Sequence, residues 1–251
     1  MALINKNQIK NRFAAAQASY PQNALAQQQI NQHLIQLLAK TERRHFQQIL
    51  EIGCGTGDFT ARLLDYATVE RFYLNDLYQS ESITDLLRKQ AHWQFIEGDI
   101  EQLPLSEKFD LIASASTVQW LEDKPQFLQR CATQLKAYGT LLFNSFAPDN
   151  LSEIRELTGI GLVYPQVEQW QQWLKSSFTI QHLSVETIQL SFPSPLAVLQ
   201  HLRNTGVTAT QKQFWTKQKL QRFVAEYQDR FSNKNGQVSL TYCPLYVVAV
   251  K

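Results

Sequence analysis

Three glycines, Gly53, Gly55 and Gly57, stand at alternate positions in the stretch "LEIGCGTGDFT" (residues 50–60), directly after a short apolar run. Glycine loses more backbone entropy on folding than any other residue, so a cluster of glycines needs a local reason. The usual reasons are a positive φ angle or a close approach of the backbone to another group. Both apply where a strand ends and a helix begins beside a bound nucleotide. The stretch therefore predicts a strand–loop–helix unit that contacts a ligand.

The rest of the first half repeats this alternation of short apolar runs and helical patterns. Residues 5–40 have the pattern of a helix that is interrupted near Pro21, because a proline disfavours the helical conformation in the residue before it. Strands that alternate with helices imply right-handed crossovers and a mostly parallel sheet. Strands are expected within residues 47–55, 69–77, 92–100, 109–117 and 139–147, and helices within 60–66, 83–90 and 125–135.

The second half is less regular, but several of its boundaries are clear. Gly159 ends one helical pattern, and the helix expected from Ser194 and Pro195 stops at Gly206, which is a strong pair of boundary signals. Residues 178–192 alternate well enough for a strand or a hairpin. Further helices are expected within residues 166–177 and 216–231, and a final strand within 240–251.

The residues around the glycines restrict the ligand. A phosphate-binding loop needs Lys-Ser or Lys-Thr after the glycines, whereas Asp58 and Phe59 follow here. A dinucleotide site prefers G-x-G-x-x-G, and this spacing is G-x-G-x-G. Glu51, just before the glycines, would repel a pyrophosphate and attract a cationic amino-acid group. The stretch favours a ligand that has a ribose and an ammonium group but no phosphate.

Two further acids occupy places where such a ligand could bind. Asp76 ends the second expected strand, where a carboxylate can accept both ribose hydroxyls. Asp99 follows the third expected strand and could accept the exocyclic amine of an adenine, while Ile100 covers the ring. With the glycine loop, these residues would line the carboxyl edge of one parallel sheet, where open α/β folds bind ligands.

Four of these segments together resemble a known superfamily. "LEIGCGTG", "LNDL", "EGDIEQLP" and "FDLIASASTVQWLED" are similar to the motifs of class I methyltransferases that use S-adenosylmethionine, in order and at fitting separations, over roughly residues 48–146. The resemblance implies an α/β Rossmann-like fold with a seven-stranded, mostly parallel sheet whose last strand is antiparallel. It implies S-adenosylmethionine as cofactor and S-adenosylhomocysteine as product. The residues expected to bind the cofactor are Glu51, Gly53, Gly55, Gly57, Asp76, Leu77, Asp99, Ile100, Ser114 and Gln119.

A narrower resemblance covers nearly the whole chain. "NRFAAAQASY", "ALAQQQINQHL", "EIRELTGIGLVYP", "HLRNTGV" and "LTYCPLYVVA" are similar to malonyl-[acyl-carrier protein] O-methyltransferases of biotin synthesis. This family implies methyl esterification of the free carboxylate of a malonyl thioester, carried by acyl carrier protein or by coenzyme A. A carboxylate is ionised at neutral pH and needs no general base. The run "SASTVQW" replaces the Asn-Pro-Pro found in related enzymes that act on nitrogen, which suggests that no amine is oriented there.

The resemblance also suggests how the chain is divided and which residues meet the substrate. We expect one methyltransferase domain over residues 1–251, with a helical lid at 1–45, a cofactor-binding core at 46–146, helical inserts and a strand forming a substrate cap at 147–235, and the final strand at 236–251. Tyr20 is the expected site residue of the lid. Arg203 is expected to bind the substrate in preference to Arg155, although most helical arginines are solvated surface charges. Trp120 either touches the cofactor or packs in the core.

Composition excludes several other classes of protein. The net charge of +2 in 251 residues is too small to indicate nucleic-acid binding, which needs a clustered basic face. The three cysteines show neither metal-ligand spacing nor a disulfide framework, so no metal site is expected. The polar N-terminus and the lack of a long apolar run predict a cytoplasmic protein with no membrane segment. We further expect a monomer, in which Lys212, Lys217, Lys219 and Arg222 either steer an acidic carrier protein or form a solvated helix face.

Three other functions stay open. The acceptor could be another small carboxylic acid or a quinone-like ring. The chain could bind S-adenosylmethionine without catalysis, since nothing in the cofactor motifs excludes a sensor. A nicotinamide-binding module is disfavoured by Glu51 and by the spacing of the glycines.

Overall fold

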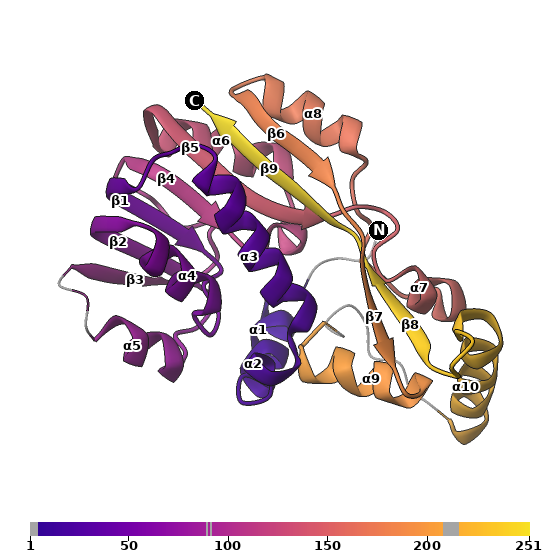
Figure 1. Cartoon of the computed structure of the whole chain (residues 1–251). Helices are drawn as coiled ribbons and strands as arrows, with labels where there is room; N and C mark the ends of the chain where they lie inside the picture. The colour runs from indigo at the N-terminus through magenta and orange to yellow at the C-terminus, as the bar shows by residue number, and fades with distance from the viewer. Residues whose placement is uncertain (1–4, 89, 91, 208–215) are drawn as a thin grey trace.

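The computed structural model describes residues 5–88, 90, 92–207 and 216–251. Seven strands form one sheet in the order β3-β2-β1-β4-β5-β9-β6 (Figure 1). β1 to β5 are parallel to one another, and β9 lies antiparallel between β5 and β6. This confirms the predicted mostly parallel sheet with an antiparallel last strand. The strands are β1 His45–Ile52, β2 Thr68–Asp76, β3 Trp93–Glu97, β4 Phe109–Ser114, β5 Leu135–Phe146, β6 Thr179–Val185 and β9 Pro244–Val250.

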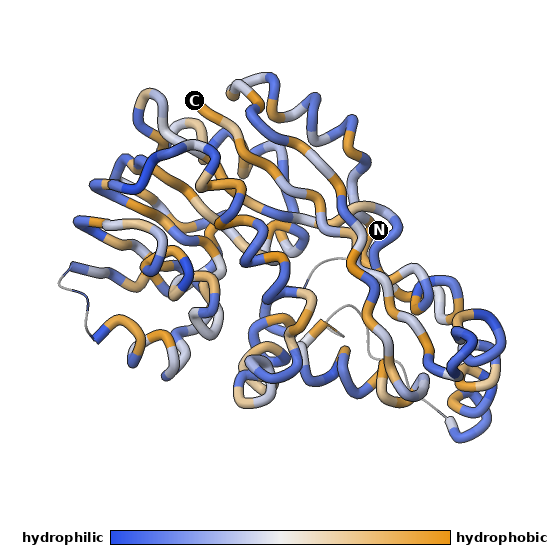
Figure 2. Tube along the Cα trace, in the orientation of Figure 1, coloured by the Kyte–Doolittle hydropathy of each residue, from blue (hydrophilic) through white to orange (hydrophobic). Residues whose placement is uncertain are grey.

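Helices cover both faces of this sheet. Successive residues of a strand point to opposite faces, and Ile49 accordingly packs in the core on one side of β1 while Leu50 packs on the other. The tube in Figure 2 is apolar along the central strands, as expected for strands buried on both faces. One face is covered by α3 Leu25–Ala39, α4 Asp58–Tyr66 and α5 Glu81–Leu87, and the other by α6 Lys124–Gln134 and α8 Val167–Lys175.

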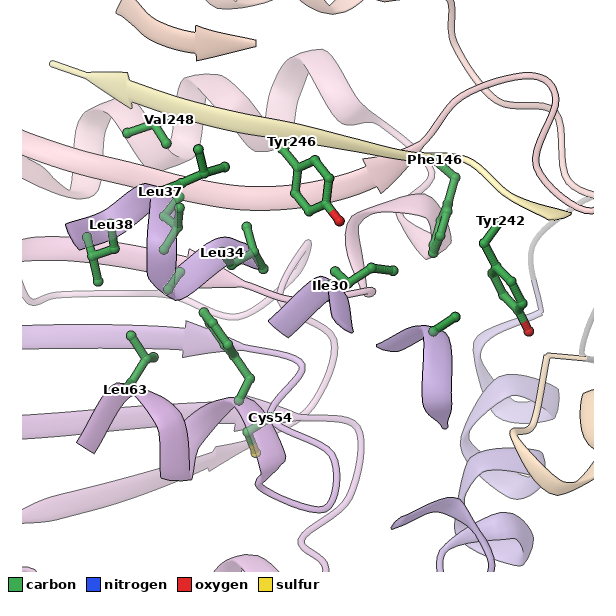
Figure 3. Close-up of a cluster of buried hydrophobic side chains, with 14 of the residues drawn as sticks. Ile30, Leu34, Leu37, Leu38, Cys54, Leu63, Phe146, Tyr242, Tyr246 and Val248 are labelled. Atoms are coloured by element: carbon green, nitrogen blue, oxygen red, sulfur yellow. The ribbon is translucent and has the colours of Figure 1, made fainter. Parts of the chain in front are cut away.

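The helix predicted over residues 5–40 is three helices, α1 Lys6–Ala16, α2 Tyr20–Asn23 and α3. Pro21 lies in the first turn of α2, where the missing N–H costs nothing. The chain therefore breaks just before Tyr20 and again at Ala24. α3 is the segment that docks on the sheet, and Figure 3 shows its apolar stripe between β9 and α4. The stripe consists of Ile30, Leu34, Leu37 and Leu38.

The second half adds a smaller layer beside the sheet. It comprises α7 Ser152–Thr158, α9 Pro195–Asn204, α10 Lys217–Phe231, β7 Ile188–Phe192 and β8 Val238–Tyr242. Gly159 ends α7 in the left-handed conformation, and Gly206 follows α9 with a φ of 71°, so both predicted stops are confirmed. β7 and β8 form a separate two-stranded antiparallel sheet.

Two expectations for the strands were wrong. Residues 178–192 do not form a hairpin, because β6 pairs with β9 while β7 pairs with β8. The final strand is also divided: Cys243 separates β8 from β9, which belong to different sheets. The Cys243 N–H leaves the ladder to donate to Asn150 Oδ1 at 3.0 Å, and Pro244, which has no N–H, begins β9. Figure 1 shows the β6–β7 and β8–β9 ribbons bending together out of the large sheet.

Candidate functional site

A cavity lies at the carboxyl ends of the parallel strands, beneath the N-terminal helices. Its position is the one predicted from the glycines and the acids. The helices contribute Lys6, Ile9, Lys10, Phe13, Tyr20, Gln27 and Asn31. The sheet edge and its loops contribute Ile52, Gly53, Cys54, Gly55, Thr56, Asp58, Phe59, Asn75, Asp76, Leu77, Tyr78, Gly98, Asp99, Ile100, Ala115, Ser116, Thr117, Trp120 and Leu121.

The glycines differ in what surrounds them. A Cβ atom on Gly53 would overlap the Thr117 side chain at 2.0 Å, so packing alone requires glycine there. Gly55, with a φ of 54°, has no described atom within 4 Å of the point where a Cβ would lie, so its open side is the cavity that it lines. Gly57 caps the N-terminus of α4, and a Cβ there would lie 2.8 Å from Ile83 Cδ1. Of the three positions, Gly55 is the one where the backbone is left bare toward a ligand.

Asp76 is held rigidly at the rim of the glycine loop. Its Oδ2 accepts the Gly55 N–H at 2.8 Å and its Oδ1 accepts the Leu77 N–H at 2.7 Å. Burial raises the pKa of the Asp76 carboxyl, while these backbone hydrogen bonds oppose the shift. Asp76 and Leu77 both line the cavity, as predicted.

Asp99 and Ile100 also line the cavity, at an end covered by α1. Lys6 Nζ lies 3.4 Å from Asp99 Oδ1 and 2.6 Å from Glu101 Oε2. These ion pairs fasten the first turn of α1 to the loop that carries the predicted adenine-binding residues.

Glu51 is only 1% exposed and lies beneath the glycine loop, outside the set of described lining residues. Its Oε2 has no hydrogen-bond partner among the described residues. Burial is the main cause that raises the pKa of the Glu51 carboxyl to about 8; Thr60 opposes the shift, and the nearby carboxylates of Asp76 and Asp58 contribute to it. A cationic donor close to Glu51 would give Oε2 the hydrogen-bond partner that it lacks among the described residues.

The lid residues form an apolar cover. Tyr20 lines the cavity from α2, and burial raises the pKa of its hydroxyl, which stays protonated at neutral pH. Trp120 lines the cavity and also packs against Ile9 and Phe13, so the packing alternative is confirmed, whereas its contact with the cofactor stays a prediction. The ring centroids of Phe13 and Trp120 lie 5.8 Å apart, edge to face.

Two predicted cofactor residues lie behind the cavity wall and not at its surface. The Ser114 hydroxyl is buried and donates to the Ile52 carbonyl at 2.9 Å, because its side chain points across to β1. Gln119 is buried and its Nε2 donates to the Ser116 carbonyl. Among the described residues, Ala115, Ser116 and Thr117 take their places in the lining.

Arg203 does not face the cavity as expected. It is exposed on α9 and absent from the described lining, whereas Arg155 is half-buried and its Nη1 donates to the Asn150 carbonyl at 3.4 Å. The end of α9 nevertheless touches the lid. The Ser19 hydroxyl donates to the Asn204 carbonyl at 3.0 Å, and Gly206 packs against the Phe13 ring.

Gln27 and Asn31 of α3 are among the lining residues that sequence reasoning missed. Both are buried. Gln27, Ile30, Asn31 and Leu34 follow one another at helical spacing, so two polar side chains interrupt an apolar stripe. A buried polar residue on the apolar face of a helix requires partners, and this signal could have drawn attention to them.

No candidate metal site or membrane span appears in the described ranges. No group of three or more His, Cys, Asp or Glu residues there could hold a metal ion. No helix in that part of the chain is long and apolar enough to cross a membrane.

Comparisons with known proteins identify similar sequences over the full length. A family model described as a methyltransferase domain matches residues 50–143. Proteins named malonyl-[acyl-carrier protein] O-methyltransferase are 44% identical in Haemophilus ducreyi, covering 100% of this chain and 99% of the relative, and 41% identical in Porphyromonas gingivalis, covering 98% and 96%.

Solved structures show the same fold at low sequence identity. The YcgJ protein from Bacillus subtilis has a TM-score of 0.64 at 18% identity, covering 88% of this chain and 98% of that one. A putative methyltransferase from Bacillus halodurans has a TM-score of 0.61 at 16% identity, covering 87% and 98%. The N-methyltransferase NodS from Bradyrhizobium japonicum, in complex with S-adenosylhomocysteine, has a TM-score of 0.52 at 18% identity, covering 88% and 85%.

Proposed function

Because this chain belongs to the malonyl-[acyl-carrier protein] O-methyltransferases, we propose that it methylates the free carboxylate of a malonyl thioester. The methyl donor is S-adenosylmethionine, and the products are the malonyl methyl ester and S-adenosylhomocysteine. The observation that carries the proposal is similarity above 40% identity over the whole chain, including the segments expected to form the lid and the substrate cap.

The residues of the cavity fit this cofactor. The open side of Gly55 lets the backbone approach a ligand, and the Asp76 carboxylate beside it can accept ribose hydroxyls. Asp99 and Ile100 line the same cavity and are proposed to bind the adenine amine and ring, and Leu77 lies beside Asp76. Glu51 Oε2 is buried and has no hydrogen-bond partner among the residues described, so a positively charged group of the ligand could bind beside it.

The chain has to position the acceptor and keep water out. The cofactor supplies a methyl group activated by a sulfonium. The malonyl carboxylate is already ionised at neutral pH, so no side chain needs to remove a proton. Ile9, Phe13 and Trp120 cover the cavity with apolar surface, which excludes water and holds the reacting groups in line.

Tyr20 and Arg203 remain the proposed substrate-binding residues. The Tyr20 hydroxyl, protonated at neutral pH, can donate a hydrogen bond to a carboxylate inside the cavity. A guanidinium binds a carboxylate through two parallel hydrogen bonds. The exposed Arg203 would reach the acceptor from the rim where α9 meets the lid, and Arg155 is the alternative inside the cap.

The acceptor is proposed to arrive on acyl carrier protein or on coenzyme A, in the cytoplasm and at a monomeric enzyme. Carrier proteins are usually acidic, and Lys217 and Lys219 are exposed at the start of α10. Arg222 is paired with Glu226 at 2.6 Å, which reduces its value for steering, and Lys212 lies outside the described residues.

A comparison of acceptors tests the proposal. Purified protein is given S-adenosylmethionine labelled in the methyl group, with malonyl-carrier protein, malonyl-coenzyme A, free malonate or a quinol. We expect kcat/KM to be highest for a malonyl thioester. Faster transfer to a free small acid or to the quinol would assign the acceptor to another class, and tight cofactor binding without transfer to any of them would indicate a sensor.

A further inference from the structure

Several buried side-chain oxygen atoms in the described residues have no hydrogen-bond partner, and three of them are amide or carboxyl oxygens next to the glycine loop. These three are Gln27 Oε1 and Asn31 Oδ1 on α3 and Glu51 Oε2 on β1. The residues that carry them are 5%, 7% and 1% exposed. A buried acceptor that is deprived of its hydrogen bond costs free energy, so three together indicate a ligand that donates.

The orientation of the Asn31 amide is fixed by its neighbour. Asn31 Nδ2 lies 2.7 Å from Asp58 Oδ2, and the same carboxylate oxygen accepts Arg62 Nε at 3.0 Å. A carboxylate paired with an arginine can only accept hydrogen bonds. The amide nitrogen of Asn31 must therefore face Asp58, which leaves Oδ1 as the group available to a ligand.

The Gln27 amide is held from the opposite direction. It hydrogen-bonds the Tyr242 hydroxyl, which lies 2.8 Å from His201 Nε2. His201 is buried and burial lowers its pKa to about 4, so the imidazole is neutral and can accept a hydrogen bond from the Tyr242 hydroxyl. The hydroxyl oxygen then accepts from the Gln27 amide nitrogen. This sequence of bonds leaves Gln27 Oε1 for the cavity that Gln27 lines.

The charges nearby select a cation. Glu51, Asp58 and Asp76 are close enough to influence one another electrostatically. The lysines of the cavity are engaged elsewhere, Lys6 by Asp99 and Glu101 and Lys10 by Glu97. A carboxylate oxygen placed directly against these three oxygens would be repelled. A primary ammonium group has three N–H donors and one positive charge, which matches three acceptor oxygens in an acidic surrounding.

We propose that Gln27 and Asn31, together with Glu51, bind the α-ammonium group of the cofactor. The inference rests on the proposed S-adenosylmethionine-dependent function. It gives α3 a direct part in recognising the amino-acid end of the ligand. It also makes Tyr242 and His201 positioning residues, since they act on the ligand through Gln27.

Calorimetry with three ligands tests the assignment without turnover. S-adenosylhomocysteine carries the ammonium and the carboxylate, its decarboxylated analogue carries the ammonium alone, and 5′-methylthioadenosine carries neither. Each is titrated into the wild type, Asn31→Leu, Gln27→Met and the matched control Gln29→Met, which changes an exposed residue of the same helix.

We expect Asn31→Leu and Gln27→Met each to weaken the two ammonium-bearing ligands by about tenfold or more, the effect of losing a hydrogen bond to a charged group. Affinity for 5′-methylthioadenosine should be unchanged, which also shows that the variants are folded, and Gln29→Met should bind all three ligands as the wild type does.

Three outcomes would overturn the assignment. Wild-type affinities in both variants would show that the amides do not touch the ligand. A loss confined to S-adenosylhomocysteine would assign them to its carboxylate. An equal loss for 5′-methylthioadenosine would give them a purely structural role. If the wild type itself failed to bind S-adenosylhomocysteine, the proposed function would fail instead, and the two failures are therefore distinguishable.

Discussion

At the scale of single residues, the site depends on glycines with positive φ angles and on a partly buried carboxylate that accepts backbone hydrogen bonds. The sequence was sufficient to locate Gly53, Gly55 and Asp76, because their spacing after an apolar run has few structural explanations. Polar residues within an apolar stripe were the one local signal for Gln27 and Asn31, but their neighbours Asp58 and Tyr242 lie far away along the chain and could not be predicted from that pattern.

Gly55→Val tests whether the loop is shaped for a ligand. The β-branched side chain would enter the open space beside Gly55 and would strain a backbone with a φ of 54°. We expect S-adenosylhomocysteine binding to be lost in calorimetry. Gly236→Val is the matched control, because Gly236 has a φ of 75° and equally open surroundings in an exposed turn. If Gly55→Val still binds tightly while folded, the glycine serves only the turn.

Glu51 predicts a pH dependence of stability in the ligand-free protein. Its pKa is about 8 when folded, above the ordinary value of 4.5, so folding retains a proton that the unfolded chain releases. The contribution of Glu51 to the free energy of unfolding is complete below about pH 4.5. It is lost as pH rises towards 8, by up to about 1.4 kcal/mol per pH unit. Asp58, Asp76 and the Cys54 thiol are the titratable groups near it.

Chemical denaturation between pH 5 and 8 measures this contribution, with Glu51→Gln as reference, since glutamine imitates the protonated carboxyl. The free energy of unfolding of the wild type should fall relative to that of the variant as pH rises through this window. Parallel curves would mean that Glu51 is already ionised in the folded protein.

At the scale of helices and strands, local patterns predicted elements well and pairing poorly. The strands and helices of the first half lie where the alternation placed them. Residues 178–192 were expected to form a strand or a hairpin, and they form two strands in different sheets, because β6 and β7 take their partners from residues 238–250, beyond the reach of any local pattern. Cys243 and Pro244 lie at the division of the last strand, where the Cys243 N–H turns to Asn150.

The helix α1 lines one end of the cavity, and we expect it to limit the release of a bound ligand. Lys6 is 19% exposed at its side chain and pairs with Asp99 and Glu101, so part of the attraction is screened by salt. Lys6→Met should increase the dissociation rate of S-adenosylhomocysteine a few-fold, in keeping with about 0.2–1 kcal/mol for a partly exposed pair. The rate should also become less sensitive to salt. Stopped-flow displacement measures both, and an unchanged rate would mean that α1 does not limit release.

At the scale of the whole molecule, the N-terminal helices contact both the cavity and the end of α9. α2 meets the end of α9 through Ser19 and Asn204, and Phe13 of α1 lies between Trp120 and Gly206. The predicted division of residues 1–251 into lid, core, cap and final strand stays a prediction. The place of Arg203 could not be read from sequence, because helical spacing does not tell which side of α9 faces the lid.

Arg203→Ala distinguishes substrate binding from cofactor binding. Since Arg203 is absent from the described lining of the cavity, affinity for S-adenosylmethionine should be nearly intact. If it holds the malonyl group, kcat/KM should fall at least tenfold, a loss of about 1.4 kcal/mol or more of transition-state stabilisation. Arg203→Lys should recover only part of this, because an ammonium cannot reproduce a planar guanidinium. Full activity in Arg203→Ala, with a loss in Arg155→Ala, would move the role to Arg155.

Methylation of the malonyl carboxylate is tested most directly by locating the transferred methyl group. Malonyl-carrier protein is incubated with the enzyme and S-adenosylmethionine labelled in the methyl group. The acyl chain is then analysed by mass spectrometry before and after mild alkaline treatment. We expect one labelled methyl on the carboxylate, which base removes as labelled methanol, and no label on a carrier whose malonyl group is already esterified. Label on the pre-esterified acyl chain, or no transfer by protein that binds S-adenosylhomocysteine tightly, would contradict this expectation.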